Sequence, residues 1–322
     1  MADLSQASAR ADRDGCSQSQ SQSQRIDEEP VFRAEISSAA TLVGTLRGIL
    51  AKGGDSVSAT HADGYSTVVT ADSRGLKFTY TDASKSMQAC ASIQEDLFDV
   101  WSLSPHADQV RFRLRLSLLL QCLSCFGQNA LEKTNLKMAY YPNEECFSFQ
   151  LLESDVVTEC KITTLDDDDA DPTEDFLGYF EASEFQNRII IASDRLRDAF
   201  HEIAELPGAS TAHVLMSPAR PFFRVSTMGE HGSCQIDFPD CSETFTQFRC
   251  ESTVQCSYRM SFIQHACRAL QFSHRTFIRM NSDGLLSMQH MVKFGDSKTY
   301  VDFYIVSDAD PGGDEDEDED PY

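Results

Sequence analysis

Apolar and polar residues alternate along most of this chain, which is the pattern of β-strands with one buried face. Four other segments repeat apolar residues at spacings of three and four, as amphipathic helices do. The predicted strands are 31–36, 65–70, 74–80, 86–93, 110–116, 135–141, 146–153, 156–165, 187–191, 211–217, 222–228, 232–238, 245–250, 255–260, 274–280, 285–294 and 299–306. The predicted helices are 39–52, 117–126, 194–205 and 261–270, with Ser38 and Ser193 as expected caps of the first and third.

The order of these elements occurs twice. Residues 115–126 align without a gap with residues 259–270, at an offset of 144. The apolar positions of residues 36–49 recur in residues 190–203 at an offset of 154, and a weaker match relates 76–89 to 223–236. Two tandem copies of one unit predict an α+β fold in which each copy packs two helices on an antiparallel sheet.

Two acidic runs divide the chain. The 322 residues carry a net charge of −24, and seven carboxylates lie within 166–175 and nine within 308–320. Such runs are typical of solvated, disordered segments. We therefore expect a disordered N-terminal arm at 1–30, a first domain at 31–165, an acidic linker at 166–186, a second domain at 187–307 and a disordered acidic tail at 308–322.

Composition excludes some classes of protein and leaves others open. Outside the two acidic runs the chain is only mildly acidic, so its charge does not exclude DNA as a partner. No apolar run approaches the ~18 residues that a membrane span needs, and residues 1–24 are polar. Eleven cysteines fit an intracellular, reducing compartment if they are free thiols.

The chain lacks the sequence motifs of common catalytic sites. It has no Gly-Lys-Ser/Thr phosphate loop and no Gly-x-Ser-x-Gly elbow. Cys122 and Cys125 have metal-type spacing, but no second pair lies in register, which favours buried structural thiols. The carboxylates lie mostly in the two acidic runs, where no rigid metal site is expected. The sequence therefore predicts no cofactor, no metal and no catalytic activity.

Several separate blocks, in order, resemble the Rad-one subunits of the 9-1-1 (nine-one-one) DNA damage checkpoint clamp, which belong to the PCNA-like DNA sliding clamps. The resemblance covers residues 31–306. The blocks that carry it are 74–78, 91–93, 112–127, 157–162, 196–200, 216–227 and 284–291. The serine–glutamine N-terminus, residues 53–64 and the long acidic tail depart from the family pattern, but none of them touches the repeated core.

This resemblance implies a DNA clamp fold that forms one third of a pseudo-sixfold ring. It implies a non-catalytic, nuclear protein that forms a heterotrimer with two paralogous subunits, of the Rad-nine and Hus-one type. An ATP-dependent clamp loader would place the ring around double-stranded DNA at damage sites. The ring would then activate checkpoint kinase signalling and tether checkpoint and repair factors.

Candidate site residues follow from the helix faces and from the resemblance. The helix faces opposite the apolar stripes predict a DNA-facing channel at Arg47, Lys52, Arg195, Arg197, Gln264, His265 and Arg268. Helix 194–205 also carries Asp198, Glu202 and Glu205, so DNA contact from this chain is expected to be weak. An ordinary solvated helix face stays open as the alternative for each of these basic residues.

Two further surfaces are implied by the clamp resemblance. Ring interfaces would form at strand edges, at Val157, Thr158, Cys160 and Ile162 on one side and at Cys234, Ile236 and Phe238 on the other. A groove for partner peptides would be bordered by Phe176, Leu177, Tyr179 and Phe180, although these residues could equally anchor the linker. Ser17, Ser19, Ser21 and Ser23 each precede glutamine, a kinase target pattern that low complexity alone would also explain.

Two other functions stay open at this point. A 3′–5′ DNA exonuclease, an activity proposed for this family, would need a rigid cluster of metal-binding carboxylates. A homotrimeric replication clamp would need self-complementary edges and a more basic channel, which the acidic helix 194–205 argues against.

Overall fold

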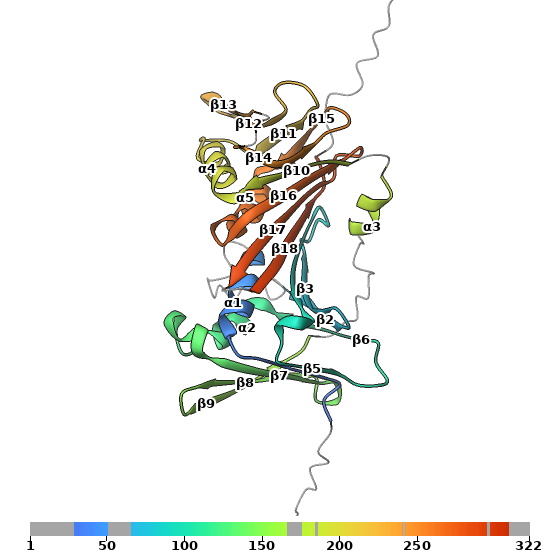
Figure 1. Ribbon diagram of the computed structural model, residues 1–322, viewed down its shortest axis with the longest axis vertical. Coiled ribbons are helices and arrows are strands. Elements are labelled where there is room, and N and C mark those ends of the chain that lie inside the picture. Colours follow the sequence, from blue (N-terminus) through green and yellow to red (C-terminus); the bar gives the residue numbers. More distant parts are fainter. Residues whose placement is uncertain are drawn as a thin grey trace, which may run out of the picture.

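The computed structural model describes residues 29–50, 66–165, 176–183, 186–239, 241, 243–294 and 297–308. They form an elongated molecule of helices and antiparallel strands, which confirms the predicted mixture of helix and antiparallel sheet (Figure 1). The helices are α1 (Ala39–Ile49), α2 (Leu116–Leu123), α3 (Phe176–Glu181), α4 (Ser193–Ala204) and α5 (Met260–Cys267). Short 3₁₀ turns are η1 (Glu95–Leu97), η2 (Gln128–Lys133), η3 (Pro142–Glu144) and η4 (Arg268–Gln271).

The strands form three sheets. In spatial order, the first contains β5 (Val100–Leu103), β1 (Phe32–Ile36), β7 (Asn135–Tyr141), β8 (Cys146–Glu153) and β9 (Val156–Thr163). The second contains β14 (Phe245–Arg249), β10 (Gln186–Ala192), β16 (Ser273–Asn281), β17 (Leu286–Phe294), β18 (Ser297–Ile305), β4 (Met87–Gln94), β3 (Gly75–Thr81), β2 (Ser66–Asp72) and β6 (Gln109–Arg115). The third contains β13 (Gly232–Phe238), β12 (Phe223–Gly229), β11 (Thr211–Met216) and β15 (Val254–Arg259).

The central sheet joins the two halves of the chain. The last strand, β18, lies between β17 and β4, and Phe303 pairs with Ala89 of β4 and with Met288 of β17. α1 packs against this junction, where its Thr45 hydroxyl lies 2.8 Å from that of Thr299 in β18. One continuous apolar core therefore extends through both halves.

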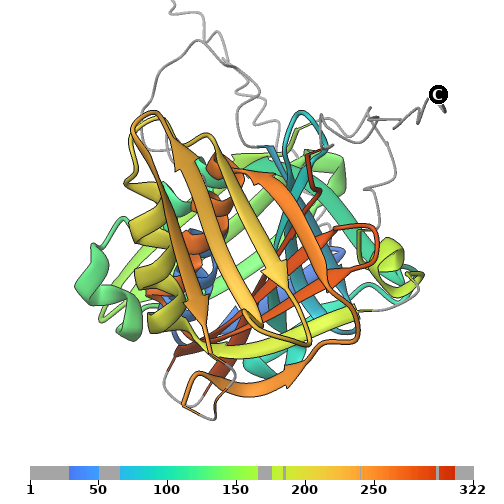
Figure 2. The ribbon, with the colours of Figure 1, turned by 90° about the horizontal axis from the view of Figure 1, so that it is seen from above.

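The helices lie on two opposite sides of the sheets. α1, α2, α4 and α5 cover one side, and the short helix α3 lies on the other (Figures 1 and 2). The buried side chains of β10, Ile189 and Ile191, belong to the core, whereas Arg188, one residue before Ile189, points to the α3 side. This arrangement gives the molecule a helix side and an α3 side.

Helix boundaries and caps differ from the predictions in detail. α1 ends at Ile49, before the predicted stop, and Ser38 occupies its N-cap without a side-chain hydrogen bond. Ser193 is the first residue of α4 instead of its cap. Its hydroxyl lies 2.9 Å from that of Thr276, so the side chain serves strand packing instead of capping.

Two histidines are enclosed in the core. His290 of β17 is fully buried, and its Nδ1 lies 3.0 Å from the Thr276 hydroxyl. Burial lowers the pKa of His290 to about 3, because a charged imidazolium would lose its hydration there. Burial also lowers the pKa of His265 in α5.

Stability is therefore expected to fall as the pH drops below about 6.5. The unfolded chain takes up a proton at His290 below that pH, whereas the folded chain does not until the pH approaches 3. This one residue should thus remove about 1.4 kcal/mol of stability per pH unit between those limits. Urea unfolding at pH 7.5, 6.0 and 5.0 tests this expectation. His290→Gln should reduce the pH slope by about one proton, whereas the exposed His231→Gln should not change it; equal slopes in both variants would contradict the assignment.

Candidate functional site

The helix side brings together most of the residues that were predicted to face DNA. Arg195 and Arg197 of α4 and Gln264 of α5 are exposed there. Arg47 of α1 is half-buried, and its guanidinium donates hydrogen bonds to Gln128 Oε1 and, at 3.4 Å, to Ser124 Oγ. Arg47 therefore ties α1 to the segment after α2. Lys52 lies outside the described residues.

His265 and Arg268 hold the end of α1. His265 is 8% exposed, and its Nε2 lies 2.9 Å from the carbonyl oxygen of Ile49. Arg268 donates from Nη1 to the carbonyl oxygen of Leu50 at 2.6 Å. The last carbonyls of a helix need such partners. The prediction that His265 lies on an exposed helix face is therefore wrong, since the imidazole is enclosed between α1, β18 and α5.

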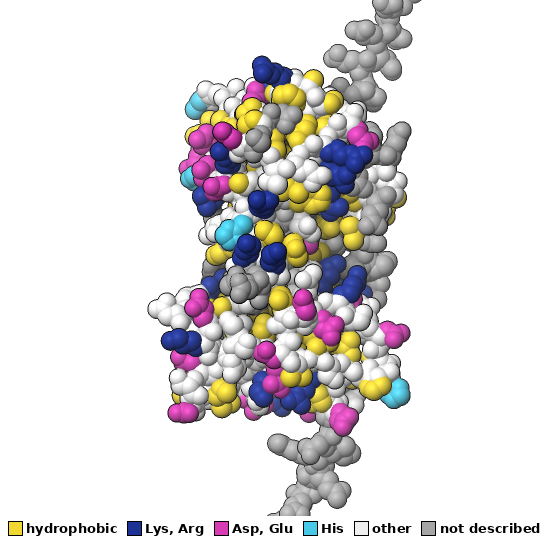
Figure 3. Space-filling view, viewed as in Figure 1, with side chains coloured by type: hydrophobic (Ala, Val, Ile, Leu, Met, Phe, Trp, Pro, Cys, Tyr) yellow, Lys and Arg dark blue, Asp and Glu magenta, His cyan; other side chains and the backbone are white. Residues whose placement is uncertain are grey.

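A cavity of about 640 Å³ opens on the helix side between α4, α5 and the β3–β4 turn. Its walls are mixed in character: Tyr80, Phe200 and Phe262 are aromatic, Arg197 and Arg268 are basic, and Asp82, Asp198 and Glu205 are acidic. Figure 3 shows further acidic side chains gathered over α4. Asp194, Asp198, Glu202 and Glu205 are all exposed, so α4 offers a phosphate backbone little net attraction.

Both strands that were predicted to form ring interfaces lie at the edge of a sheet. β9 is the outer strand next to β8, and β13 is the outer strand next to β12. Val157 of β9 is 61% exposed. The side chains of Thr158, Cys160, Cys234 and Ile236 are half-buried, and those of Ile162 and Phe238 are buried within this chain. The side chains of Ile162 and Phe238 are therefore not exposed to a neighbour.

α3 separates the four predicted groove residues into two pairs. Phe176 and Phe180 are buried and form a small apolar cluster with Leu285 and Tyr304. The Arg279 guanidinium lies 4.7 Å from the centre of the Phe180 ring, a cation–π contact. The two phenylalanines thus anchor the segment, and the prediction that they border an open groove is wrong. Leu177 and Tyr179 are 42% and 65% exposed.

Truncating the Phe180 ring should release α3 without unfolding the rest of the chain. Phe180→Ala removes a fully buried ring from a small cluster of its own, so we expect a loss of about 3 kcal/mol confined to α3. Limited proteolysis should cut near residues 176–183 at least tenfold faster than in the parent chain. Tyr179→Ala is the control on the same helix and should leave the cutting rate unchanged. Equal rates in the two variants would show that Phe180 does not hold α3.

Predictions from the sequence also concern metal ligands, thiols and membrane-spanning helices. Within these ranges, no three His, Cys, Asp or Glu side chains are grouped so that they could hold a metal ion. Every cysteine among them is a free thiol, with Cys122 half-buried and Cys125 exposed, so the expectation that both are buried is wrong for Cys125. None of the helices placed by the structure is long and apolar enough to cross a membrane. Ser17, Ser19, Ser21 and Ser23 lie outside the described residues.

Comparison with known proteins identifies the family of the chain. The chain matches the family described as "Repair protein Rad1/Rec1/Rad17" over residues 31–292. It is 34% identical over 241 residues to the "Cell cycle checkpoint protein RAD1" of Mus musculus and to that of Homo sapiens, which covers 74% of this chain and 82% of each relative. The "DNA damage checkpoint control protein rad1" of Schizosaccharomyces pombe is 28% identical over 256 residues, covering 73% of this chain and 77% of the relative. The chain therefore belongs to the Rad1/Rec1/Rad17 family of repair proteins.

Proposed function

We propose that this chain is a non-catalytic subunit of a heterotrimeric checkpoint clamp that encircles double-stranded DNA at damage sites. Its membership of the family carries this proposal, since relatives at 34% identity are named cell cycle checkpoint proteins. Its partners in the ring are two paralogous subunits of the Rad-nine and Hus-one type. An ATP-dependent clamp loader places the ring, which activates checkpoint kinase signalling and tethers repair factors in the nucleus.

Two tandem domains, at 31–165 and 187–307, form one third of the pseudo-sixfold ring in this proposal. The order of elements supports them. α1 and α4 each follow an antiparallel strand, β1 and β10, and α2 and α5 each follow directly on a strand, β6 and β15. Four helices from each of three chains would line the hole with twelve. DNA held by encirclement needs few tight contacts, which suits the mixed charge of α4.

The edges of β9 and β13 are the surfaces that join neighbouring subunits. Each edge strand carries backbone groups that another strand can pair with. Leu177 and Tyr179 on the exposed side of α3 are the groove residues that can still meet a partner peptide. Phosphorylation of the serine–glutamine run would add charge to the N-terminal arm.

The mass of the assembly tests the proposal. Light scattering of the full chain should give a monomer alone and a one-to-one-to-one complex with the two paralogous subunits. Val157→Lys places a charge on the exposed edge of β9 and should weaken the complex at least tenfold, whereas Leu177→Lys on α3 should not. A stable trimer of this chain alone, or no complex with the paralogous subunits, would reject the heterotrimer.

A further inference from the structure

Three arginines lie directly opposite one another across neighbouring strands on the α3 side of the central sheet. Arg188 of β10 pairs with Arg249 of β14 and with Arg279 of β16. Residues paired in this way project from the same face, with Cβ atoms about 5 Å apart. The row continues through Ser287 of β17 to Tyr304 of β18. Figure 3 shows basic side chains gathered where β10 begins and β16 ends.

The described residues supply hydrogen-bond partners for only part of the donor groups in this arginine row. Arg249 forms a half-exposed ion pair with Glu251 at 3.2 Å, and Arg279 donates to Ser287 Oγ at 3.1 Å. The Nε atoms of Arg188 and Arg279 are buried without a hydrogen-bond acceptor among the described residues. Like charges placed directly opposite destabilise a sheet. An anionic group that bridges the guanidinium groups would offset this repulsion, and carboxylates fit the guanidinium fork well.

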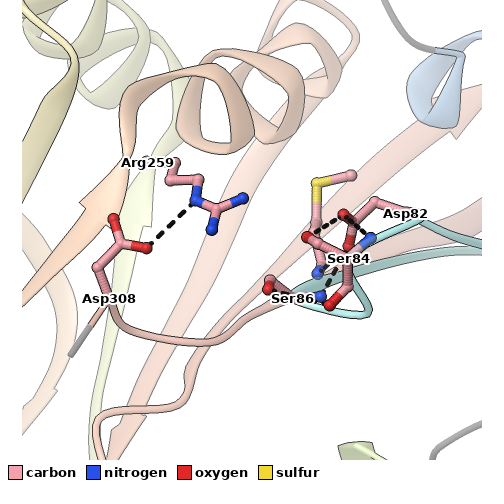
Figure 4. A network of polar contacts seen from close by, with 6 residues as sticks. Asp82, Ser84, Ser86, Arg259 and Asp308 are labelled. Carbon is pink, nitrogen blue, oxygen red and sulfur yellow. Dashed lines mark hydrogen bonds and ion pairs between the residues drawn. The ribbon is translucent and has the colours of Figure 1, made fainter.

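The acidic tail begins close to this row. Three residues separate Tyr304, the last member of the row, from Asp308. The Asp308 amide donates to the Ser257 carbonyl oxygen at 2.8 Å, and its carboxylate lies 3.3 Å from Arg259 Nε. Figure 4 shows this ion pair beside the β3–β4 turn, whose Ser86 carbonyl oxygen accepts from Val306 at 2.9 Å. The structure thus fixes the point from which the tail starts.

The length and charge of the tail match the row. Residues 309–322 carry eight carboxylates and no lysine or arginine. Fourteen residues extend up to about 48 Å. The strands of the row are about 4.8 Å apart, which places Arg279 about 10 Å and Arg249 about 19 Å from Tyr304. Exposed carboxylates on α4 would repel the tail from the helix side.

We propose that the acidic tail, residues 309–322, binds the arginine row of Arg188, Arg249 and Arg279 within the same chain. The tail carboxylates neutralise the three opposed guanidinium groups. The bound tail also blocks this face from other anionic chains. A free acidic peptide therefore binds the arginine row only after it displaces the tail.

Zero-length cross-linking of the full chain tests this proposal. A carbodiimide condenses a carboxylate with an amine to an amide and takes up the released water as a urea. Arg188→Lys supplies the amine within the row, and trypsin then leaves the tail on one peptide, Thr299–Tyr322. We expect an amide between position 188 and a carboxylate of residues 310–320. Its yield should fall at least fivefold between 50 mM and 500 mM NaCl, because screening weakens exposed charge pairs.

Arg195→Lys places the same amine on α4 and is the matched control, for which we expect no link to the tail. Arg249→Lys tests the row at a second position, and circular dichroism confirms that each variant is folded. Four outcomes would overturn the proposal: no amide at 188 and 249, equal yields at 195, links from the row only to carboxylates outside the tail, or links found only in covalent dimers.

Discussion

Gly75→Ala is expected to destabilise the folded chain by about 3–5 kcal/mol, the combined effect of a strained backbone and an overpacked site. Gly75 begins β3 with a backbone φ of +133°, which residues other than glycine rarely adopt. A Cβ atom there would lie 2.2 Å from the Ile93 carbonyl oxygen and 2.8 Å from the Glu95 amide nitrogen. Both are backbone atoms of the paired strand and its turn, so no side-chain rotation relieves the overlap.

Urea unfolding followed by circular dichroism measures this loss. Gly232→Ala is the matched control, because a Cβ at that hairpin position meets no atom within 4 Å. Its effect should stay within about 0.5 kcal/mol. If Gly75→Ala cost no more than Gly232→Ala, the close approach of β3 to the end of β4 would be incorrect.

The second large effect is expected at Phe303, in the strand that joins the two halves. Its ring is fully buried, with centroids 5.5 Å from His265 and 5.8 Å from His290. Removing it should create a cavity where α5, β17 and β18 meet. Phe303→Ala should therefore cost about 3–5 kcal/mol.

Phe303→Leu keeps most of the volume and should cost less than about 1.5 kcal/mol. Because one sheet contains β18 and β4, unfolding followed by calorimetry should remain a single transition in both variants. Two separate transitions in the parent chain, or equal losses in the two variants, would show that Phe303 does not couple the halves.

Local patterns predicted strands well because each strand buries one face. Alternation placed β7, β8, β12 and β13 within one or two residues. It missed β5, four residues with no fully buried member, and it could not reveal that β18 pairs with β4. The alternation of apolar and polar residues within a strand does not indicate which strand, some 200 residues away, it pairs with.

The sequence predicted those site residues whose exposure depends only on their position around a single helix. Arg195, Arg197 and Gln264 are exposed as their spacing predicted. His265 was wrongly predicted to be exposed because α1 ends against that side of α5. The spacing of apolar residues within one helix does not show where a neighbouring helix packs. The arginine row was missed for a similar reason, since its three members lie far apart in sequence and only strand register aligns them.

The place of β18 in the central sheet also bears on how the chain folds during its synthesis. β4 is complete at residue 94, but its partner begins only at residue 297. At about 5–20 residues per second, the ribosome needs roughly 10–40 s to deliver the rest. Throughout that interval the emerging chain presents β4 as an open edge, so β4 needs a chaperone's protection from pairing with another chain.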